Sequence, residues 1–444
     1  MHEIFENLIP NLVSLWKGEF KELDISDSPF VLLPAVWERL GAACVDSGAT
    51  IPSAFGARVP NIATEAYLFT AEMWCFFALH LAPILLRRKF QDQRYYRHYM
   101  ELVKIINVCL QFEITDDDIT KVREGVVKWV SDYERLYVEY LPERASACPL
   151  TIHALLHIPD ALEMIGPVWT VWEFPTERFC GILLPAVKSR RFPYASLSSY
   201  AADIAQLSQI ELKYDLHEQL SLKPESRTTS DEYSYQCDAY PKCMLLGPRR
   251  TEDVNKSLHS KIAQCLATRF NVTMATARRH VPKRLQQWGR ILRLEGGDLI
   301  RAADLISESQ NSRDASWIRY QLLVDKNAHI KRAAPEFFAQ NFYGQLRTTF
   351  VLEIPASEEL GTDTTSTLLL AAIYTAEIEL TSDSYKLPFY KKMGRLEVVD
   401  IASVQCVVGR VYDAARGWWG IIDRSGPYAH AQFVSDGEDM VEDE

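Results

Sequence analysis

Long apolar runs and leader-like segments are scarce in this sequence. The most apolar run, residues 74–86, is interrupted by His80 and Pro83 and is too short to span a bilayer. No arginine-bearing leader precedes the first apolar residues. These absences argue against a secreted or membrane protein, so we expect an intracellular protein with no membrane partner.

The short motifs of several common enzyme classes are also missing. The chain has no G-x-x-x-x-G-K-[ST] phosphate loop, no G-x-S-x-G elbow and no dinucleotide-binding fingerprint. His153 and His157 stand four residues apart, as zinc ligands on a helix do, but no Glu follows His153 and Pro159 limits the helix beyond. We therefore expect a half-buried structural pair of histidines in preference to a metal site.

The cysteines do not form a pattern that would hold a metal or a set of disulfides. The nine cysteines are odd in number, scattered and mostly placed in apolar stretches, which favours reduced thiols in the core. Cys237 and Cys243 are the one close pair, and their spacing matches no common zinc site. We expect no bound metal here.

What the sequence does contain is an ordinary globular composition. Its 444 residues, 48% apolar and 24% charged, are enough for two or three domains. Thr115 precedes three aspartates and is expected to cap a helix. Residues 1–220 predict a mainly helical domain, because apolar side chains recur there at helical spacing. The clearest stretches are residues 1–16, 63–86, 95–112 and 116–140.

Beyond residue 220 the character of the sequence changes. Residues 221–250 are rich in Ser, Thr, Pro and charge and predict a flexible linker. Residues 251–311 predict a basic helical connector, with helical periodicity at 254–270 and 281–294. β-branched and aromatic runs in residues 312–434 predict a small antiparallel sheet or barrel, and residues 435–444 predict a disordered acidic tail. The predicted fold class is therefore α+β multidomain, helical in its N-terminal two thirds.

Positive charge is concentrated in one segment of an otherwise acidic chain. The net charge is −11, yet residues 269–293 contain no Asp or Glu. Phe270, His280 and Trp288 are interleaved with the cations, which is typical of phosphate contact combined with stacking on bases. A solvated helix surface is the alternative. The cations are Arg269, Arg278, Arg279, Lys283, Arg284, Arg290 and Arg293.

A second candidate stretch places carboxylates close to cations. Glu173 and Glu177 lie near Arg178 and a basic run at residues 188–191. Acidic side chains that hold Mg²⁺ beside phosphate-binding cations suit phosphodiester chemistry. The alternative, favoured on the residues alone, is that Arg178 forms a salt bridge that stabilises the start of a helix.

Several of these stretches together resemble one family. Residues 148–197 combine the two histidines, a Gly-Pro step before Trp169, a Pro-x-Glu-Arg element and a basic turn leading to Pro193. This combination resembles the block downstream of the catalytic core in CACTA-type (En/Spm) DNA transposases, in the version abundant in mushroom-forming fungi. Residues 51–86 and 95–115 resemble the helical segment before that block. The later stretches resemble the family's C-terminal extension, so the resemblance covers nearly the whole chain.

The resemblance implies the remnant of an RNase H-like core with a helical insertion. In the family an aspartate typically precedes the equivalent of residues 1–16, so the catalytic aspartates are expected to be missing from this chain. Glu177 is the implied third acidic residue, with Glu163 and Glu173 as rivals. One glutamate cannot hold two Mg²⁺ ions about 3.5–4 Å apart. We expect no cofactor for this chain alone, and Mg²⁺ only where a complete core is present.

The family also implies DNA and other transposase subunits as partners, and a nuclear location. We expect a truncated, transposon-derived protein that is catalytically inactive alone and retains nucleic-acid binding. The residues expected to contact phosphates are Lys188, Arg190, Arg191, Arg269, Arg278, Arg279, Lys283, Arg284, Arg290 and Arg293.

Two other interpretations stay open. One is a protein-interaction scaffold without DNA binding, whose acidic tail contacts a partner. The other is an active Mg²⁺-dependent nuclease completed by a separate chain. Asp116, Asp117 and Asp118 are the nearest other acidic cluster, but successive residues of a helix point in different directions and cannot converge on one ion. The sequence indicates no oligomeric state.

Overall fold

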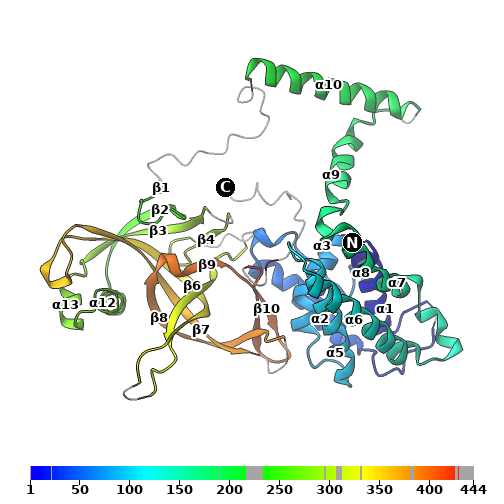
Figure 1. Cartoon of the computed structure of the whole chain (residues 1–444), viewed down its shortest axis with the longest axis horizontal. Helices are drawn as coiled ribbons and strands as arrows, with labels where there is room; N and C mark the ends of the chain where they lie inside the picture. The colour runs from blue at the N-terminus through cyan, green and yellow to red at the C-terminus, as the bar shows by residue number, and fades with distance from the viewer. Residues whose placement is uncertain are drawn as a thin grey trace.

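The computed structural model describes residues 2–21, 23–189, 191–216, 234–294, 297–306, 313–330, 333–380, 385–425 and 429. Helices make up the N-terminal half and antiparallel strands most of the C-terminal half, and the two parts lie side by side (Figure 1). This confirms a mixed fold with a helical part followed by a β part.

The main helices of the first part pack as a bundle. The opening apolar face is confirmed as buried: Phe5, Leu8 and Leu12 are each 1% exposed or less. Trp16 lies edge-on to Tyr99 at 5.3 Å between ring centroids. The elements are η1 (His2–Leu8), α1 (Ile9–Lys17), α2 (Pro34–Thr50), α3 (Ala71–Phe76), η4 (Phe77–Leu81), α4 (Ala82–Leu85), α5 (Gln93–Cys109), α6 (Asp116–Tyr133), η5 (Glu134–Val138), α7 (Leu150–Ala154), η7 (Leu155–His157) and α8 (Ile158–Ile165).

Local capping signals work as expected in this part. Thr115 caps α6, since its hydroxyl accepts a hydrogen bond from the Asp118 amide at 3.2 Å while the Asp118 carboxylate accepts one from the Thr115 amide. The helical stretch predicted for residues 63–86 is shorter and broken. Thr70 caps α3 at its start, and Pro83, which has no amide hydrogen, follows the π-helical turn η4.

Two helices leave the bundle. α9 (Phe174–Leu183) rises from it, and α10 (Pro193–Tyr214) continues beyond α9, well away from the packed helices (Figure 1). We call these two helices the arm. Among the residues that the structure describes, no helix is long and apolar enough to cross a membrane.

The β part is one curled antiparallel sheet that closes about half of a barrel (Figure 1). Its main strand order is β1-β2-β3-β6-β7-β8-β11-β10, with β4 paired to β3 and β5 paired to both β6 and β9. The strands are β1 (Ser234–Tyr235), β2 (Cys243–Asp253), β3 (Arg284–Arg293), β4 (Leu299–Arg301), β5 (Trp317–Asp325), β6 (Phe337–Ile354), β7 (Ser366–Leu380), β8 (Pro388–Asp400), β9 (Val404–Val407), β10 (Gly409–Asp413) and β11 (Trp418–Ile422).

The sheet begins earlier in the chain than predicted. The helix expected over residues 281–294 is wrong, because β3 occupies most of this stretch and pairs with β2 and β6. Leu285 and Ile291 lie on one face of β3 and Trp288 on the other, and all three are buried, so their spacing of three imitates a helix. β1 and most of β2 likewise lie within the expected linker, so the sheet includes strands from well before the predicted start of the β domain.

The helix expected over residues 254–270 is confirmed. α12 (Lys256–Phe270) and the short α13 (Met274–Arg279) pack on the outer surface of the sheet. Ile262 and Leu266 of α12 are fully buried in one cluster with Phe350 and Leu370 of the strands. Three segments lie outside the described residues. They are residues 217–233, which include the first part of the expected linker, residues 430–434 at the end of the expected β region, and the expected acidic tail, residues 435–444.

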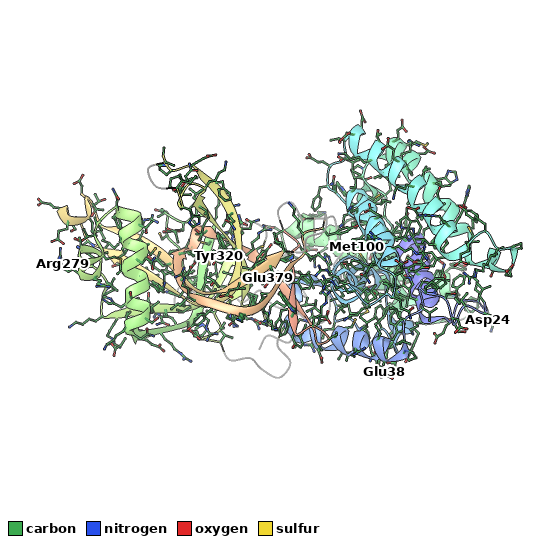
Figure 2. All side chains as sticks on the ribbon, turned by 90° about the horizontal axis from the view of Figure 1, so that it is seen from below. Asp24, Glu38, Met100, Arg279, Tyr320 and Glu379 are labelled. Carbon is green, nitrogen blue, oxygen red and sulfur yellow. The ribbon has the colours of Figure 1, made fainter. Side chains whose placement is uncertain are left out.

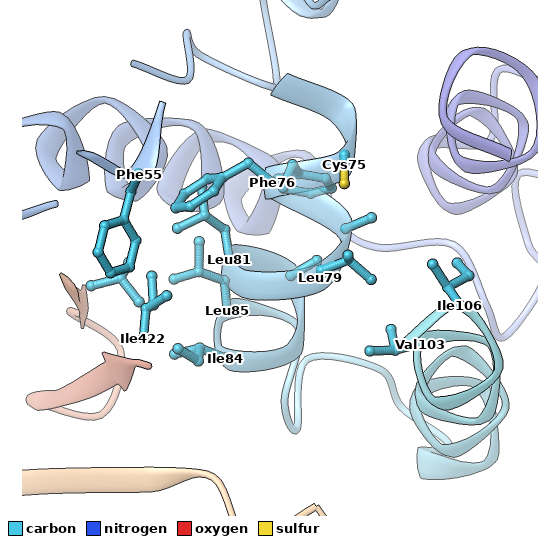
Figure 3. Packing of buried hydrophobic residues seen from close by; sticks show 14 of the residues in the cluster. Phe55, Cys75, Phe76, Leu79, Leu81, Ile84, Leu85, Val103, Ile106 and Ile422 are labelled. Atoms are coloured by element: carbon cyan, nitrogen blue, oxygen red, sulfur yellow. The ribbon is translucent and has the colours of Figure 1, made fainter. Parts of the chain in front are cut away.

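Direct contacts join the helical part to the sheet. The Thr50 hydroxyl donates to the Arg410 carbonyl at 2.6 Å, and Lys89 forms an ion pair with Asp413 at 2.9 Å. Phe55 and Ile84 of the helical part also pack in one cluster with Ile422 of β11 (Figure 3). The two parts therefore share one hydrophobic core.

Candidate nucleic-acid interface

The predicted cations do not form a single patch. Arg269 ends α12, a group of four lies between α13 and β3, and Arg290 and Arg293 lie within β3. Lys188 and Arg191 are exposed between the two helices of the arm, and Arg190 lies outside the described residues. Folding therefore divides the nine described members of this predicted set among several surfaces.

Three of these arginines bond to other parts of the fold or are half-buried in it. Arg269 forms an ion pair with Asp400, which also accepts a hydrogen bond from the Tyr240 hydroxyl at 2.8 Å. Arg293 donates from Nη1 to the Val404 carbonyl at 2.5 Å. Arg290 is half-buried inside the sheet, at the level of β4. Arg290 and Arg293 are half-buried and therefore poor candidates for contact with a large ligand. Arg269 is 43% exposed but is held by Asp400, away from the four cations described next.

The four remaining cations, Arg278, Arg279, Lys283 and Arg284, form what we call the α13–β3 patch. Arg278 and Lys283 are exposed, and neither has an ion pair with the residues that the structure describes. Arg279 pairs with Glu359 at 2.9 Å and Arg284 with Asp253 at 3.4 Å. All four of these paired side chains are more than half exposed, so the pairs are weak and can exchange with other anions.

The patch lies at the end of the sheet that is remote from the helical part. Figure 2 shows Arg279 at one extreme of the molecule, far from Asp24 and Glu38 in the helices. Arg279 and His280 lower the pKa of the Glu359 carboxyl, mainly through the hydrogen bond from Arg279. Glu359 is therefore a carboxylate that partly offsets the charge of the patch.

Two further exposed cations lie on the strand that pairs with β3, and the sequence did not indicate them. Arg249 and Arg250 fall in the expected linker but lie on β2, where they pair in register with Trp288 and Gln287 of β3. Both arginines are exposed. The apolar run before them was a weak strand signal. Arg249 lies over the Trp288 ring, 5.7 Å from its centroid, and the register separates it from Arg284 by four residues of β3.

The aromatic residues expected to stack on bases are not available for this. Trp288 is 1% exposed and packs against Tyr235, with ring centroids 6.0 Å apart. Phe270 packs on the core beneath α12, and His280 faces Glu359 at 3.3 Å. The prediction of exposed stacking residues is wrong for Trp288, because pairing across β3 turns the ring toward the core.

The acidic candidates lie near the base of the arm. Glu163 of α8 forms an ion pair with Arg123 of α6 at 2.9 Å. Glu173 is exposed at the start of α9. The backbone of α9 includes Glu177, but the side chains of Glu177 and Arg178 lie outside the described residues.

Within the described part of the chain, no three His, Cys, Asp or Glu side chains are grouped so that they could hold a metal ion. His153 and His157 have their Nε2 atoms 3.3 Å apart. Both rings are exposed, so the expected half-buried environment is wrong: Ile152, not the histidines, faces the core from α7.

The cysteines are free thiols, as expected. Burial raises the pKa of Cys44, Cys75 and Cys109 to about 12, which keeps these thiols protonated and unreactive. Cys148 and Cys180 are instead exposed. The close pair Cys237 and Cys243 has no bridging partner of the kind that would complete a zinc site among the described residues.

Comparison with known proteins does not assign the chain to a family. No family model matches the chain, and neither a curated protein nor a solved structure matches it.

Proposed function

We propose that this chain is a non-catalytic, transposon-derived protein that binds nucleic acid through the α13–β3 patch. The single observation that carries this proposal is the exposed group of four cations within seven residues, two of which lack ion pairs with described residues. The resemblance to CACTA-type transposases supplies the class of ligand, and with it the RNase H-like ancestry and the nuclear location.

The physical basis of binding is the release of counterions from phosphates. Each phosphate that a Lys or Arg neutralises contributes about 0.9 to the slope of log affinity against log salt concentration. Engagement of all four cations of the patch would thus give a slope of about −3 to −4. Arg279 and Arg284 would exchange their exposed carboxylate partners for phosphate oxygens, which costs little because surface ion pairs are weak.

Catalysis is not part of the proposal for this chain alone. Two-metal phosphoryl transfer needs several carboxylates that converge on paired ions. Among the described candidates, Glu163 is engaged with Arg123 and Glu173 stands alone at a helix start. Mg²⁺ would be a cofactor only of a complete catalytic core, with Glu177 as the implied contribution from this chain.

The test is binding of a fluorescent duplex DNA, followed by anisotropy while salt is raised from about 50 mM, where phosphate contacts are strong. The double variant Arg278→Glu/Lys283→Glu is expected to lose at least about tenfold in affinity and to flatten the salt dependence. The matched control is Lys391→Glu/Lys392→Glu, which reverses two adjacent exposed lysines on β8. Absence of binding by the unaltered chain, or equal losses in both variants, would remove the proposal.

A second candidate function is a protein-interaction scaffold. The arm favours it, because α9 and α10 carry exposed large apolar side chains such as Phe179, Leu207 and Leu212. The acidic segment 435–444, expected to contact a partner, lies outside the described residues. DNA binding unaffected by charge reversal in the α13–β3 patch would favour this candidate.

A further inference from the structure

A group of four cations lies where the helical part meets the sheet. Arg87, Arg88 and Lys89 are consecutive residues of the turn between α4 and α5. Arg416 belongs to the turn between β10 and β11. The two turns meet at Asp413, because Lys89 Nζ lies 2.9 Å from its Oδ1 and Arg416 Nε lies 3.7 Å from its Oδ2. We call the four cations the junction cluster.

A single carboxylate serves two members of the junction cluster. Asp413 is 3% exposed, and its Oδ1 also accepts a hydrogen bond from the Ala415 amide at 3.2 Å. Nη2 of Arg416 is buried and has no hydrogen-bond partner among the described residues. A donor of a charged group that is withdrawn from water without an acceptor is costly. An additional anion would supply the acceptor that Asp413 does not provide.

The carboxylates that the structure describes around the junction cluster leave positive charge in excess. Arg87 lies 5.4 Å from the ring centroid of Phe389, whose register partner on β7 is Glu379. Glu379 can therefore offset one cation, in addition to the one that Asp413 offsets. Asp92, three residues after Lys89, is already paired with Arg94 at 2.9 Å. Two carboxylates thus remain to balance four cations.

The members of the junction cluster also repel one another. The pKa of Arg416 is lowered, first by burial and next by the charge of Arg87, and Arg88 acts in the same direction. Asp413 opposes this effect without cancelling it. Like charges held close together destabilise the charged form of each group. An anion that carries more than one negative charge would relieve this repulsion.

A phosphate group fits these side chains better than other common anions. Guanidinium groups present forked N–H donors that match the oxygens of phosphate. A phosphomonoester has its second pKa near about 6, so it is mostly a dianion at neutral pH and matches the excess charge. A carboxylate or a chloride ion brings only one charge. We propose that the junction cluster binds a dianionic phosphate group.

The site is independent of the α13–β3 patch, which lies at the other end of the sheet. Two sources offer the same chemistry. One is inorganic phosphate or a small phosphorylated compound, and the other is the phosphorylated end of a nucleic-acid strand. Bound phosphate would connect the turn between α4 and α5 to the turn between β10 and β11.

The experiment is equilibrium dialysis of the full chain against radiolabelled inorganic phosphate, with ionic strength kept constant by chloride. A dissociation constant on the order of 1 mM is expected for a small anion held by a few charged groups. Arg88→Gly and Arg416→Gln are each expected to weaken binding by at least about tenfold. Arg88 has a φ of 59°, where glycine is less strained, so Arg88→Gly should remain folded. Urea midpoints measured without phosphate check the folding of both variants.

The matched control is Arg395→Gln, which removes an exposed arginine on β8 and should change phosphate affinity by less than about twofold. Arg278→Glu/Lys283→Glu should leave phosphate binding unchanged, so this proposal and the proposed function can be refuted separately.

Competition by short oligonucleotides identifies the source of the phosphate. Displacement of the label by a strand with a phosphorylated end, and not by the same strand with a hydroxyl end, assigns a nucleic-acid end. Displacement by neither strand assigns a small phosphate compound. Equal displacement by both strands would overturn the proposal, because the dianion would not be required. Absence of bound phosphate at about 10 mM, or unchanged affinity in both Arg88→Gly and Arg416→Gln, would overturn it as well.

Discussion

The buried ion pair between Arg319 and Asp423 connects β5 to the end of β11. Arg319 Nη1 lies 2.7 Å from Asp423 Oδ2, and each side chain is only 5% exposed. Arg319 also donates from Nη1 to the Ser425 carbonyl at 2.8 Å and from Nε to the Gln405 side chain at 2.7 Å. The Tyr343 hydroxyl donates to the same carboxylate at 2.9 Å. Removal of the carboxylate would leave a buried cation and a buried hydroxyl without this partner.

We therefore predict that Asp423→Ala lowers the free energy of unfolding by about 3–5 kcal/mol, the usual cost of breaking a buried pair from one side. The carbonyl oxygen of Ser425 and the side-chain oxygen Oε1 of Gln405 still accept hydrogen bonds from Arg319, which favours the lower end of this range. The double variant Arg319→Met/Asp423→Ala removes both charges, so it is expected to lie within about 2 kcal/mol of the unaltered protein.

The assay is urea unfolding followed by tryptophan fluorescence, with the four proteins of the double-variant cycle measured under one set of conditions. Arg319→Met alone supplies the fourth corner and leaves Asp423 buried without its cation. A loss below about 1 kcal/mol for Asp423→Ala would show that water or neighbouring groups solvate Arg319. Additive losses in the double variant would equally refute the reasoning, since coupled charges must be non-additive.

Three other predictions follow from local features of the fold. Thr115→Ala should destabilise the helical part by about 1 kcal/mol, seen as a lower urea midpoint, because it removes the side-chain cap of α6. Gly420→Ala should cost about 1–3 kcal/mol in the same measurement, since a β-carbon there would lie 2.6 Å from Ile84 and force the packing apart. Burial lowers the pKa of His98 to about 4, so the native state resists protonation. Between about pH 6.5 and 4 the unfolded chain binds the extra proton, so stability should fall by roughly 3 kcal/mol as the pH drops through this window, and His98→Gln should flatten urea midpoints measured at these pH values.

Local structure was largely predictable from sequence wherever the signal was short-range. The Thr115 cap and the buried opening helix depend on residues within one or two turns of each other, so their pattern is visible in the chain itself. The strand-rich character of residues 337–422 was predictable for the same reason, because β-branched and aromatic runs there alternate with turn residues.

The structure differed from the prediction where long-range pairing decided the outcome. The apolar spacing of residues 285–291 suits either a helix or a strand covered on two faces, and only β2 and β6, which lie far away in the sequence, select the strand. That choice buries Trp288 and brings Arg249 over its ring. Ion pairs formed by folding likewise engage Arg269, which the charge pattern alone left available.

The sequence by itself determined the helical beginning, the strand-rich end and the uneven charge, because each depends on residue types that are visible along the chain. Tertiary structure alone decided which cations share a surface, which aromatic rings stay exposed and which helix lacks a packing partner. These properties depend on which distant segments the core brings together, and one-dimensional periodicity does not contain that information.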